Sequence, residues 1–423
     1  MNAFTQRLVL LFSDTALRNR LLFVIGALAI FRVLAAIPIP SVDAGRLELF
    51  FSSNQFFGLL NVFSGGGLSN LSIVLLGVGP YITASIIMQL MTIMIPRLKA
   101  LYQEEGELGR KKFSQYSRFL SLPIAALQGI AFLLLLERGG VIPDLPLFQF
   151  AVNVAVVTAG SVLLMWIGEL ISEYGLGNGV SIIIFAGIVA SLPSSISQAV
   201  FSFDPAQIPI YLGFLAAAVA VVAAVVVISE AERPVPVTYA KRVRGMKFFG
   251  GASTYLPLRL NQAGVIPLIF ALSLLLMPQM IASFFATSGN AIIASVANTV
   301  LGGLQNLLLY GIIYFLLVFL FTYFYTAITF EPKTIADNLQ KNGAFIPGVR
   351  PGPSTADHLA KVITRITFVG ALFLGIIAVL PIGMQAATGI QSLTIGGTAL
   401  LIVVSVVLDL TRRIDAQLSI REY

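Results

Sequence analysis

The chain of 423 residues contains no cysteine, one histidine (His358) and only 11% charged residues. Without cysteine it can form neither disulfides nor thiolate metal sites, and one histidine leaves almost nothing for zinc or haem ligation. Soluble domains carry roughly 25% charged residues, so these few charges cannot solvate a globule of this size. With 57% apolar residues and a mean hydropathy of +0.92, the chain is expected to have lipid as its natural solvent.

Long apolar runs recur along the whole sequence. About 20 consecutive apolar residues are needed for a helix to cross the hydrocarbon of a bilayer. Runs of about that length fall near 21–37, 72–95, 115–136, 149–168, 180–201, 207–229, 263–285, 305–328, 362–380 and 391–408. The sequence therefore predicts an all-α integral membrane protein with about ten transmembrane helices. The polar residues 1–20 are expected to form a cytoplasmic head, since no small-residue cleavage site follows the first apolar run.

The positive charges predict the orientation of the chain. The 26 Lys and Arg residues outnumber the 19 Asp and Glu residues, which gives a formal net charge of +7. With the N-terminus placed inside, all of the 26 Lys and Arg residues except Arg32, Arg46 and Arg138 lie in cytoplasmic segments. Because positive residues favour the cytoplasmic side, both termini are predicted to be cytoplasmic. The short connection 169–179 contains Glu169 and Glu173 but no Lys or Arg, and is a local exception.

Ten spans divide into an N-terminal half, 1–205, and a C-terminal half, 206–423. An odd number of spans in each half places the halves in opposite orientation, which is compatible with an inverted repeat around a central pore. The connections 229–260 and 331–361 are long and basic, so contacts with other macromolecules are expected on the cytoplasmic face. The connection 285–304 is expected to be a short, uncharged external loop.

The stretch before the second span is irregular. Residues 59–76 read LLNVFSGGGLSNLSIVLL, and three consecutive glycines disfavour a continuous helix by roughly 1 kcal/mol each. One interpretation is an extracellular loop ahead of an ordinary helix. The other is a half-helix folded back into a central cavity, because non-helical backbone at membrane depth survives only where protein or a water-filled cavity surrounds it.

The predicted spans contain almost no ionisable side chains. Only Arg32 lies clearly within one, near an end from which it can snorkel. A proton- or ion-coupled transporter for small solutes usually displays an acidic residue or histidine at midplane, so this class is a rival without an obvious coupling site. A structural subunit of a larger complex is a second rival. No Walker motif, Ser/His/Asp set or metal cluster is apparent, which indicates a non-enzymatic protein without a cofactor, and a pore with an apolar lining remains open.

Six blocks of sequence, which lie in order over nearly the whole chain, resemble the SecY family. They are IPIP (37–40), FSGGGLSNLSIVLLGVGPYITASIIMQ (63–89), GNGVSIIIFAGIVA (177–190), LPLRLNQAGVIPLIFA (256–271), ADNLQKNGAFIPGVRPG (336–352) and TADHLAKVITRITFVGAL (355–372). The resemblance implies the central subunit of a protein-conducting channel. Such a channel translocates unfolded secretory polypeptides and inserts membrane proteins through a lateral gate. The implied location is a bacterial plasma membrane, with a thylakoid membrane as the alternative.

The resemblance also implies partners and functional residues. The partners are SecE, SecG, the ATPase SecA, the ribosome, signal sequences and nascent polypeptides, and the lipid bilayer. The pore ring maps onto Val78, Ile82, Ile184, Ile269 and Ile402. The plug maps onto Phe63, Ser64, Gly65, Gly66, Gly67, Leu68, Ser69 and Asn70. The lateral gate maps onto Gln89 and Asn261, whereas Asn178, in GNG, is interpreted as a turn residue.

The 229–260 connection has the pattern of a β-hairpin. Apolar side chains alternate at Val235, Val237 and Tyr239 ahead of a basic stretch that ends at Gly245. The cations expected at the tip are Lys241, Arg242 and Arg244. An ordered basic finger suits docking to RNA phosphates or to an acidic protein surface, so these three cations are candidate contacts for SecA and the ribosome.

The 331–361 connection predicts a short helix and a fixed turn. Pro332 ends the preceding span, residues 333–341 are expected to be helical, and Gly343 is expected to stop that helix. Arg350 follows in GVRPG, a turn punctuated by glycine and proline. A fixed guanidinium fork suits carboxylate or phosphate recognition, and the resemblance makes Arg350 the candidate for coupling to SecA and the ribosome.

Overall fold

A computed structural model describes most of the chain. The described ranges are 14–40, 67–68, 71–138, 140–143, 145–201, 208–239, 242–244, 247–249, 253–286, 290–388 and 392–419. The chain divides into two compact units. Unit 1 comprises Met1–Ile210, Ser273–Asn306 and Ile390–Tyr423, and unit 2 comprises Tyr211–Leu272 and Leu307–Gly389. Because two segments of the second half of the sequence group with the first, the division into sequence halves stays a prediction.

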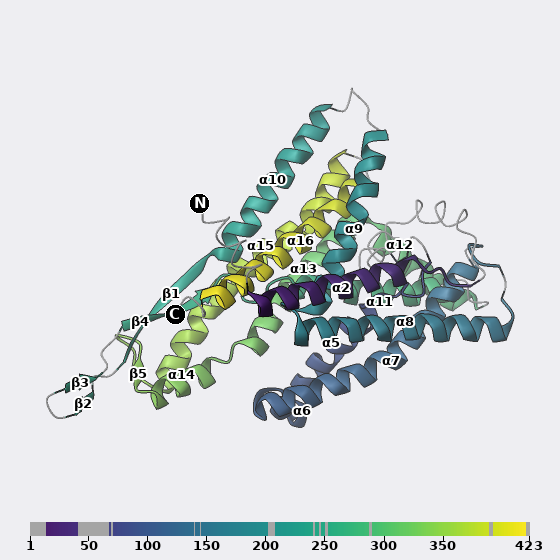
Figure 1. Cartoon of the computed structure of the whole chain (residues 1–423). Helices are drawn as coiled ribbons and strands as arrows, with labels where there is room; N and C mark the ends of the chain where they lie inside the picture. The colour runs from purple at the N-terminus through teal and green to yellow at the C-terminus, as the bar shows by residue number, and fades with distance from the viewer. Residues whose placement is uncertain are drawn as a thin grey trace. The chain divides into compact units, whose positions relative to one another are not determined.

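Unit 1 is mainly helical in its described residues. Its helices are α2 (Thr15–Ala36), α5 (Gly79–Met94), α6 (Pro96–Gln103), α7 (Gly106–Arg138), α8 (Leu147–Tyr174), α9 (Gly179–Phe201), α12 (Ala291–Gln305) and α16 (Ser392–Ser419). Helix α8 is central, since α2, α5, α7 and α9 all contact it (Figure 1). Helix α11 (Ile266–Phe285) is divided between the two units.

Unit 2 combines long helices with small antiparallel sheets. Its elements are α10 (Ile208–Glu230), β1 (Glu232–Tyr239), β2 (Arg242–Arg244), β3 (Lys247–Phe249), β4 (Ser253–Arg259), α13 (Leu307–Thr329), α14 (Pro332–Lys341), β5 (Ala344–Phe345) and α15 (Pro353–Thr388). Helices α13 and α15 pack against each other. One sheet has the order β4-β1-β5 and the other pairs β2 with β3.

The described helices agree with the predicted spans. Six are long and apolar enough to cross a membrane by length and composition, or seven if α5 and α6, which meet at a bend of 112°, form one span. Helices α9, α11 and α16 fall on the remaining predicted runs. The all-α membrane fold class is thus confirmed, and the helices are consistent with about ten spans.

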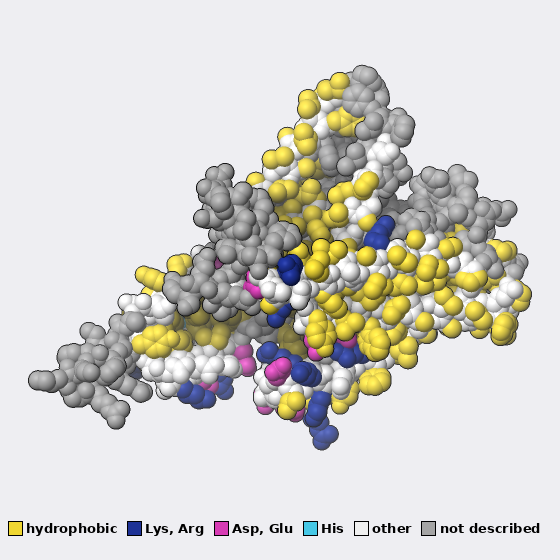
Figure 2. Space-filling view, in the orientation of Figure 1, with side chains coloured by type: hydrophobic (Ala, Val, Ile, Leu, Met, Phe, Trp, Pro, Cys, Tyr) yellow, Lys and Arg dark blue, Asp and Glu magenta, His cyan; other side chains and the backbone are white. Residues whose placement is uncertain are grey.

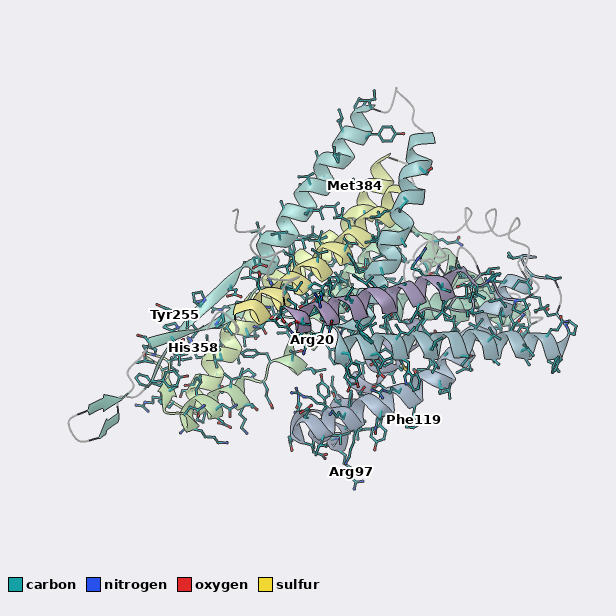
Figure 3. All side chains as sticks on the ribbon, in the orientation of Figure 1. Arg20, Arg97, Phe119, Tyr255, His358 and Met384 are labelled. Atoms are coloured by element: carbon teal, nitrogen blue, oxygen red, sulfur yellow. The ribbon has the colours of Figure 1, made fainter. Side chains whose placement is uncertain are left out.

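Hydrophobic side chains cover much of the surface of unit 1. Figure 2 shows them over its long helices, with Lys and Arg gathered around α6 and the start of α7. On α7, Phe119 is 76% exposed and Leu127 is 67% exposed. In Figure 3, Arg97 extends away from α6. An apolar surface of this extent needs lipid or a protein partner to cover it.

Helix α12 occupies the connection for which only an external loop was expected. The side chain of Asn290 accepts a hydrogen bond from the Ile292 backbone at 3.0 Å and so caps the helix. Its exposed apolar residues recur at helical spacing, at Ile292, Val296 and Val300. The capping residue and the helical spacing are both visible in the sequence. The helix was not predicted because a short stretch with almost no charge has the composition of a loop.

Helices α8 and α9 meet at a very close backbone contact. A Cβ atom built on Gly179 would lie 1.8 Å from the Gly168 carbonyl oxygen. The Ser172 hydroxyl donates to that oxygen at 2.9 Å and accepts from the Gly179 N–H at 2.8 Å. Asn178 accepts from the Ser181 N–H at 3.2 Å, which agrees with its interpretation as a turn residue.

The variant Gly179→Ala is therefore expected to lower the thermal unfolding midpoint of the detergent-purified protein by several degrees or more. Its methyl group would meet a backbone oxygen that cannot rotate away, and overpacking of this kind costs about 1–3 kcal/mol. Gly26→Ala on α2 is the control, since no atom lies within 4 Å of its new Cβ. Equal midpoints for both variants and the parent would argue against the close α8–α9 contact.

Candidate functional site

The segment 71–78, directly before α5, is buried although it is not helical. Its fully buried side chains are Leu71, Ser72, Val74, Leu75 and Val78. Successive turns are closed by bonds from Leu75 N–H to the Ser72 oxygen (2.9 Å) and from Gly77 N–H to the Val74 oxygen (2.8 Å). The predicted second span is thus helical only from Gly79 onward.

The same segment pairs with the chain that follows α2. The Ile39 N–H donates to the Leu71 oxygen at 2.8 Å, and the Ile73 N–H donates to the Ile37 oxygen at 2.9 Å. These two bonds hold an antiparallel bridge. Backbone groups that a helix would satisfy internally are satisfied here by neighbouring chain, as membrane depth requires.

The predicted plug lies mostly outside the described residues. Only Gly67 and Leu68 are described, and both are buried. The Ser72 N–H donates to the Gly67 oxygen at 2.8 Å and the Leu71 N–H to the Leu68 oxygen at 3.0 Å, while Leu71 has a φ of 41°. This is the bond pattern of a Schellman motif, here with a leucine at the left-handed position that glycine usually takes. Both interpretations of the glycine run stay open.

The predicted pore-ring residues are all buried. Exposed fractions are 0% for Val78 and Ile184, 1% for Ile402, 4% for Ile82 and 5% for Ile269. Val78 caps α5, and Ile82 lies on its first turns, four residues later on the same face. Ile184 lies on α9 and Ile402 on α16, both in unit 1, whereas Ile269 lies on the part of α11 that belongs to unit 2. The ring as a complete set stays a prediction.

The two predicted lateral-gate residues have different surroundings. The Gln89 side-chain oxygen on α5 is buried and accepts no hydrogen bond within the described residues. Asn261 instead closes the turn before α11, where its side-chain oxygen accepts from the Gly264 N–H at 2.9 Å. Gly264 has a φ of +62°. Asn261 is thus engaged locally, while Gln89 retains an unused acceptor.

An ion pair between α7 and α8 was not predicted. The Arg118 guanidinium donates to the Glu169 carboxylate. Helix α8 continues to Tyr174, so Glu169 lies on a helix and not in the cation-free connection expected from sequence. This pair could have been predicted from the sequence, because Arg118 and Glu169 lie near the same predicted membrane boundary on consecutive, antiparallel spans.

The basic hairpin forms as predicted and extends beyond the first pair of strands. Strands β1 and β4 pair from Glu232↔Arg259 to Thr238↔Ser253, and β2 pairs with β3 (Figure 1). Arg242 and Arg244 are residues of β2, while Lys241 lies outside the described residues. Figure 3 labels Tyr255 on β4, where it is 66% exposed.

The hairpin is joined to the second basic connection by β5. This strand pairs with β1 at Thr238↔Phe345 and Tyr239↔Ala344. Beneath the sheet a hydrophobic core forms between strands and α15. Its buried members are Val235, Val237, Leu258, Ala344, Ile346, Leu359, Val362, Ile363 and Ile366. The two connections, which residues 261–330 separate in sequence, therefore share one core.

Arg350 is an exposed side chain on a fixed backbone. Helix α14 forms over Pro332–Lys341, and Gly343, with a φ of +68°, follows it as predicted. The Thr355 hydroxyl donates to the Arg350 carbonyl oxygen at 2.8 Å. Gly348 and Gly352 flank the turn with φ values of 82° and 97°, a backbone region that favours glycine.

The described residues hold no group of three or more His, Asp or Glu side chains that could bind a metal ion. The single histidine, His358, lies on α15 (Figure 3).

Comparison with known proteins shows the family. The SecY family model matches residues 72–411. The protein translocase subunit SecY of Mycobacterium bovis (strain ATCC BAA-935 / AF2122/97) is 42% identical, over 96% of this chain and 96% of that protein. The protein of the same name from Streptomyces scabiei is 41% identical, over 97% of each chain.

Two solved channels share the fold. One, described as the structure of a protein conducting channel, has a TM-score of 0.64 and 18% identity, and covers 93% of this chain and 91% of its own. Sec61 in the canine ribosome-channel complex has a TM-score of 0.61 and 16% identity, with the same coverage. The matched residues and the curated relatives show that the chain belongs to the SecY family of protein-conducting channels.

Proposed function

We propose that this chain is the central channel subunit of a bacterial protein translocase, and that unfolded polypeptides cross the membrane, or enter it sideways, through it. The observation that carries the proposal is the 42% identity with a protein translocase subunit SecY over 96% of both chains. The scarcity of ionisable side chains in the spans also favours a passive channel over an ion-coupled transporter. Energy for transport then comes from partners.

The proposed orientation places both termini and the two basic connections in the cytoplasm of a bacterial cell. The distribution of Lys and Arg supports this side. The proposed partners are SecE and SecG in the membrane, SecA and the ribosome at the cytoplasmic face, and signal sequences at the lateral gate. A structural relative is described as part of a ribosome-channel complex, which supports the ribosome as a partner.

In the proposed mechanism the aliphatic ring forms a narrow, water-excluding neck. Fixed charges at such a neck would attract ions and grip oppositely charged segments of the substrate. Aliphatic side chains do neither, so they can seal against ions and still let unrelated sequences slide past. The proposed plug, 63–70, closes the idle channel on the external side, and Gln89 with Asn261 tunes the opening of the gate.

Deleting residues 64–70 tests this proposal. The variant should fold and insert, show raised ion conductance in planar bilayers, and export a reporter with a defective signal sequence. The reason is that a closed channel without its plug keeps only the ring as a barrier. A Gly/Ser replacement of equal length is the control that separates loss of these side chains from shortening of the chain. Unchanged conductance in both variants would show that the segment is only an external loop.

A further inference from the structure

We propose that Gly160 and Ser161 on α8 are positioning residues for the pore ring, because they set the place of Val78 at the start of α5. The inference rests on the proposed ring. It concerns unit 1 alone, where Val78, α5 and α8 all lie. Neither α8 residue was a candidate from sequence, where both belong to an ordinary apolar run.

Gly160 allows the backbone of the segment 71–78 to lie directly on α8. A Cβ atom at this position would come within 2.0 Å of the Ile73 carbonyl oxygen and 2.8 Å of the Ile73 carbonyl carbon. These are backbone atoms that cannot rotate away. The Ile73 N–H is held on its other side by the Ile37 oxygen at 2.9 Å. The segment is therefore enclosed between α8 and the chain after α2.

Ser161 holds the residue that precedes the ring. Its buried hydroxyl donates to the Gly77 carbonyl oxygen at 2.9 Å. This bond turns the carbonyl of the Gly77–Val78 peptide toward α8, and Gly77 has a φ of +58°, a backbone conformation that favours glycine. The Val78 oxygen then accepts from the Ile82 N–H at 3.1 Å and begins α5. A single side-chain bond thus fixes both the end of the irregular segment and the first ring residue.

These contacts matter more for Val78 than for a residue within a helix. The segment 71–78 has only single-turn bonds along its own backbone, so its shape depends on its neighbours. A buried carbonyl left without a donor is costly. Loss of the Ser161 bond should therefore let Gly77 and Val78 move, which would widen the proposed neck without changing any ring side chain.

The test compares ion leak through planar bilayers that contain the full chain purified with its native membrane partners. Ser161→Ala and Gly160→Ala should each raise the leak of the idle channel several-fold and admit a signal-defective reporter. Gly168→Ala is the matched control, about two turns later on α8, where the helix packs against α9 and not against the segment 71–78. A Cβ there would lie 3.3 Å from Val180 Cγ2, 3.4 Å from Ile183 Cδ1 and 3.5 Å from the Val180 backbone nitrogen, with no backbone overlap like that at Gly160, so its leak should match the parent.

A double-mutant cycle with Val78→Ser shows whether Ser161 acts through Val78. The leak of the double variant should be well below the product of the two separate fold-increases, since both changes disturb one site. A double-variant leak equal to that product would show that the two changes act independently, and would overturn the inference. If Val78→Ser leaks while Ser161→Ala and Gly160→Ala do not, the positioning inference is wrong and the ring stands. If none of the three leaks, the ring itself is wrong. If thermal unfolding shows that Gly160→Ala is not folded, the double-mutant cycle of Ser161 with Val78 still tests the inference.

Discussion

Exchanging Ile82 and Ile402 together for serine is expected to raise the ion conductance of the idle channel and to admit substrates with defective signal sequences. Both side chains are almost fully buried, at 4% and 1% exposure. Two hydroxyl groups would hydrate the proposed neck, which aliphatic side chains would keep dry. Single-channel conductance and export of a signal-defective reporter measure the two effects.

The double exchange of the same residues for leucine is the matched control. Leucine keeps apolarity and volume, and such swaps usually cost under about 1.5 kcal/mol. Conductance should therefore stay near that of the parent. If the serine and leucine variants behave alike, these side chains are ordinary helix packing and the pore lies elsewhere.

Arg350→Glu is expected to block SecA-driven translocation while the protein still folds and inserts. The side chain is exposed, so its replacement disturbs no packing. The turn that presents it is fixed by Thr355 and by two glycines with positive φ. Reversing a charge held in this way should cost roughly 2 kcal/mol or more of partner binding, or about 30-fold in affinity. ATP-dependent import of a preprotein into vesicles with the purified complex measures the loss.

Lys333→Glu provides the control for charge reversal as such. Lys333 is also exposed, but it lies on α14, where a single surface charge is worth little. Import should fall only slightly. Near-normal import by Arg350→Glu, or an equal loss in both variants, would contradict a specific contact at the GVRPG turn.

The sequence was sufficient for features that depend on local composition. Apolar runs predict spans because lipid leaves the backbone no partner other than its own helix, and the long helices fall on those runs. The hairpin and α14 were also predictable, since alternation, proline and glycine act within a few residues. The Gly343 stop and the turn around Arg350 belong to the same class.

The features that escaped prediction depend on contacts between distant segments. The apolar run predicted that the second span begins at Ser72. The chain is helical only from Gly79, because residues 71–78 form hydrogen bonds with the chain after α2 and with α8. The ion pair of Arg118 with Glu169 likewise joins two helices.

Composition and charge were enough to identify a multi-pass membrane protein, and six ordered motifs were enough to identify its family. Both conclusions depend only on which residues follow one another along the chain. The joining of two basic connections through β5 and the packing of the segment 71–78 against Gly160 and Ser161 were decided by tertiary structure. In each case a backbone group finds its partner far away in sequence. The effect of such a hydrogen bond, or of a glycine without a Cβ atom, can be predicted only when it is known that the two segments lie together.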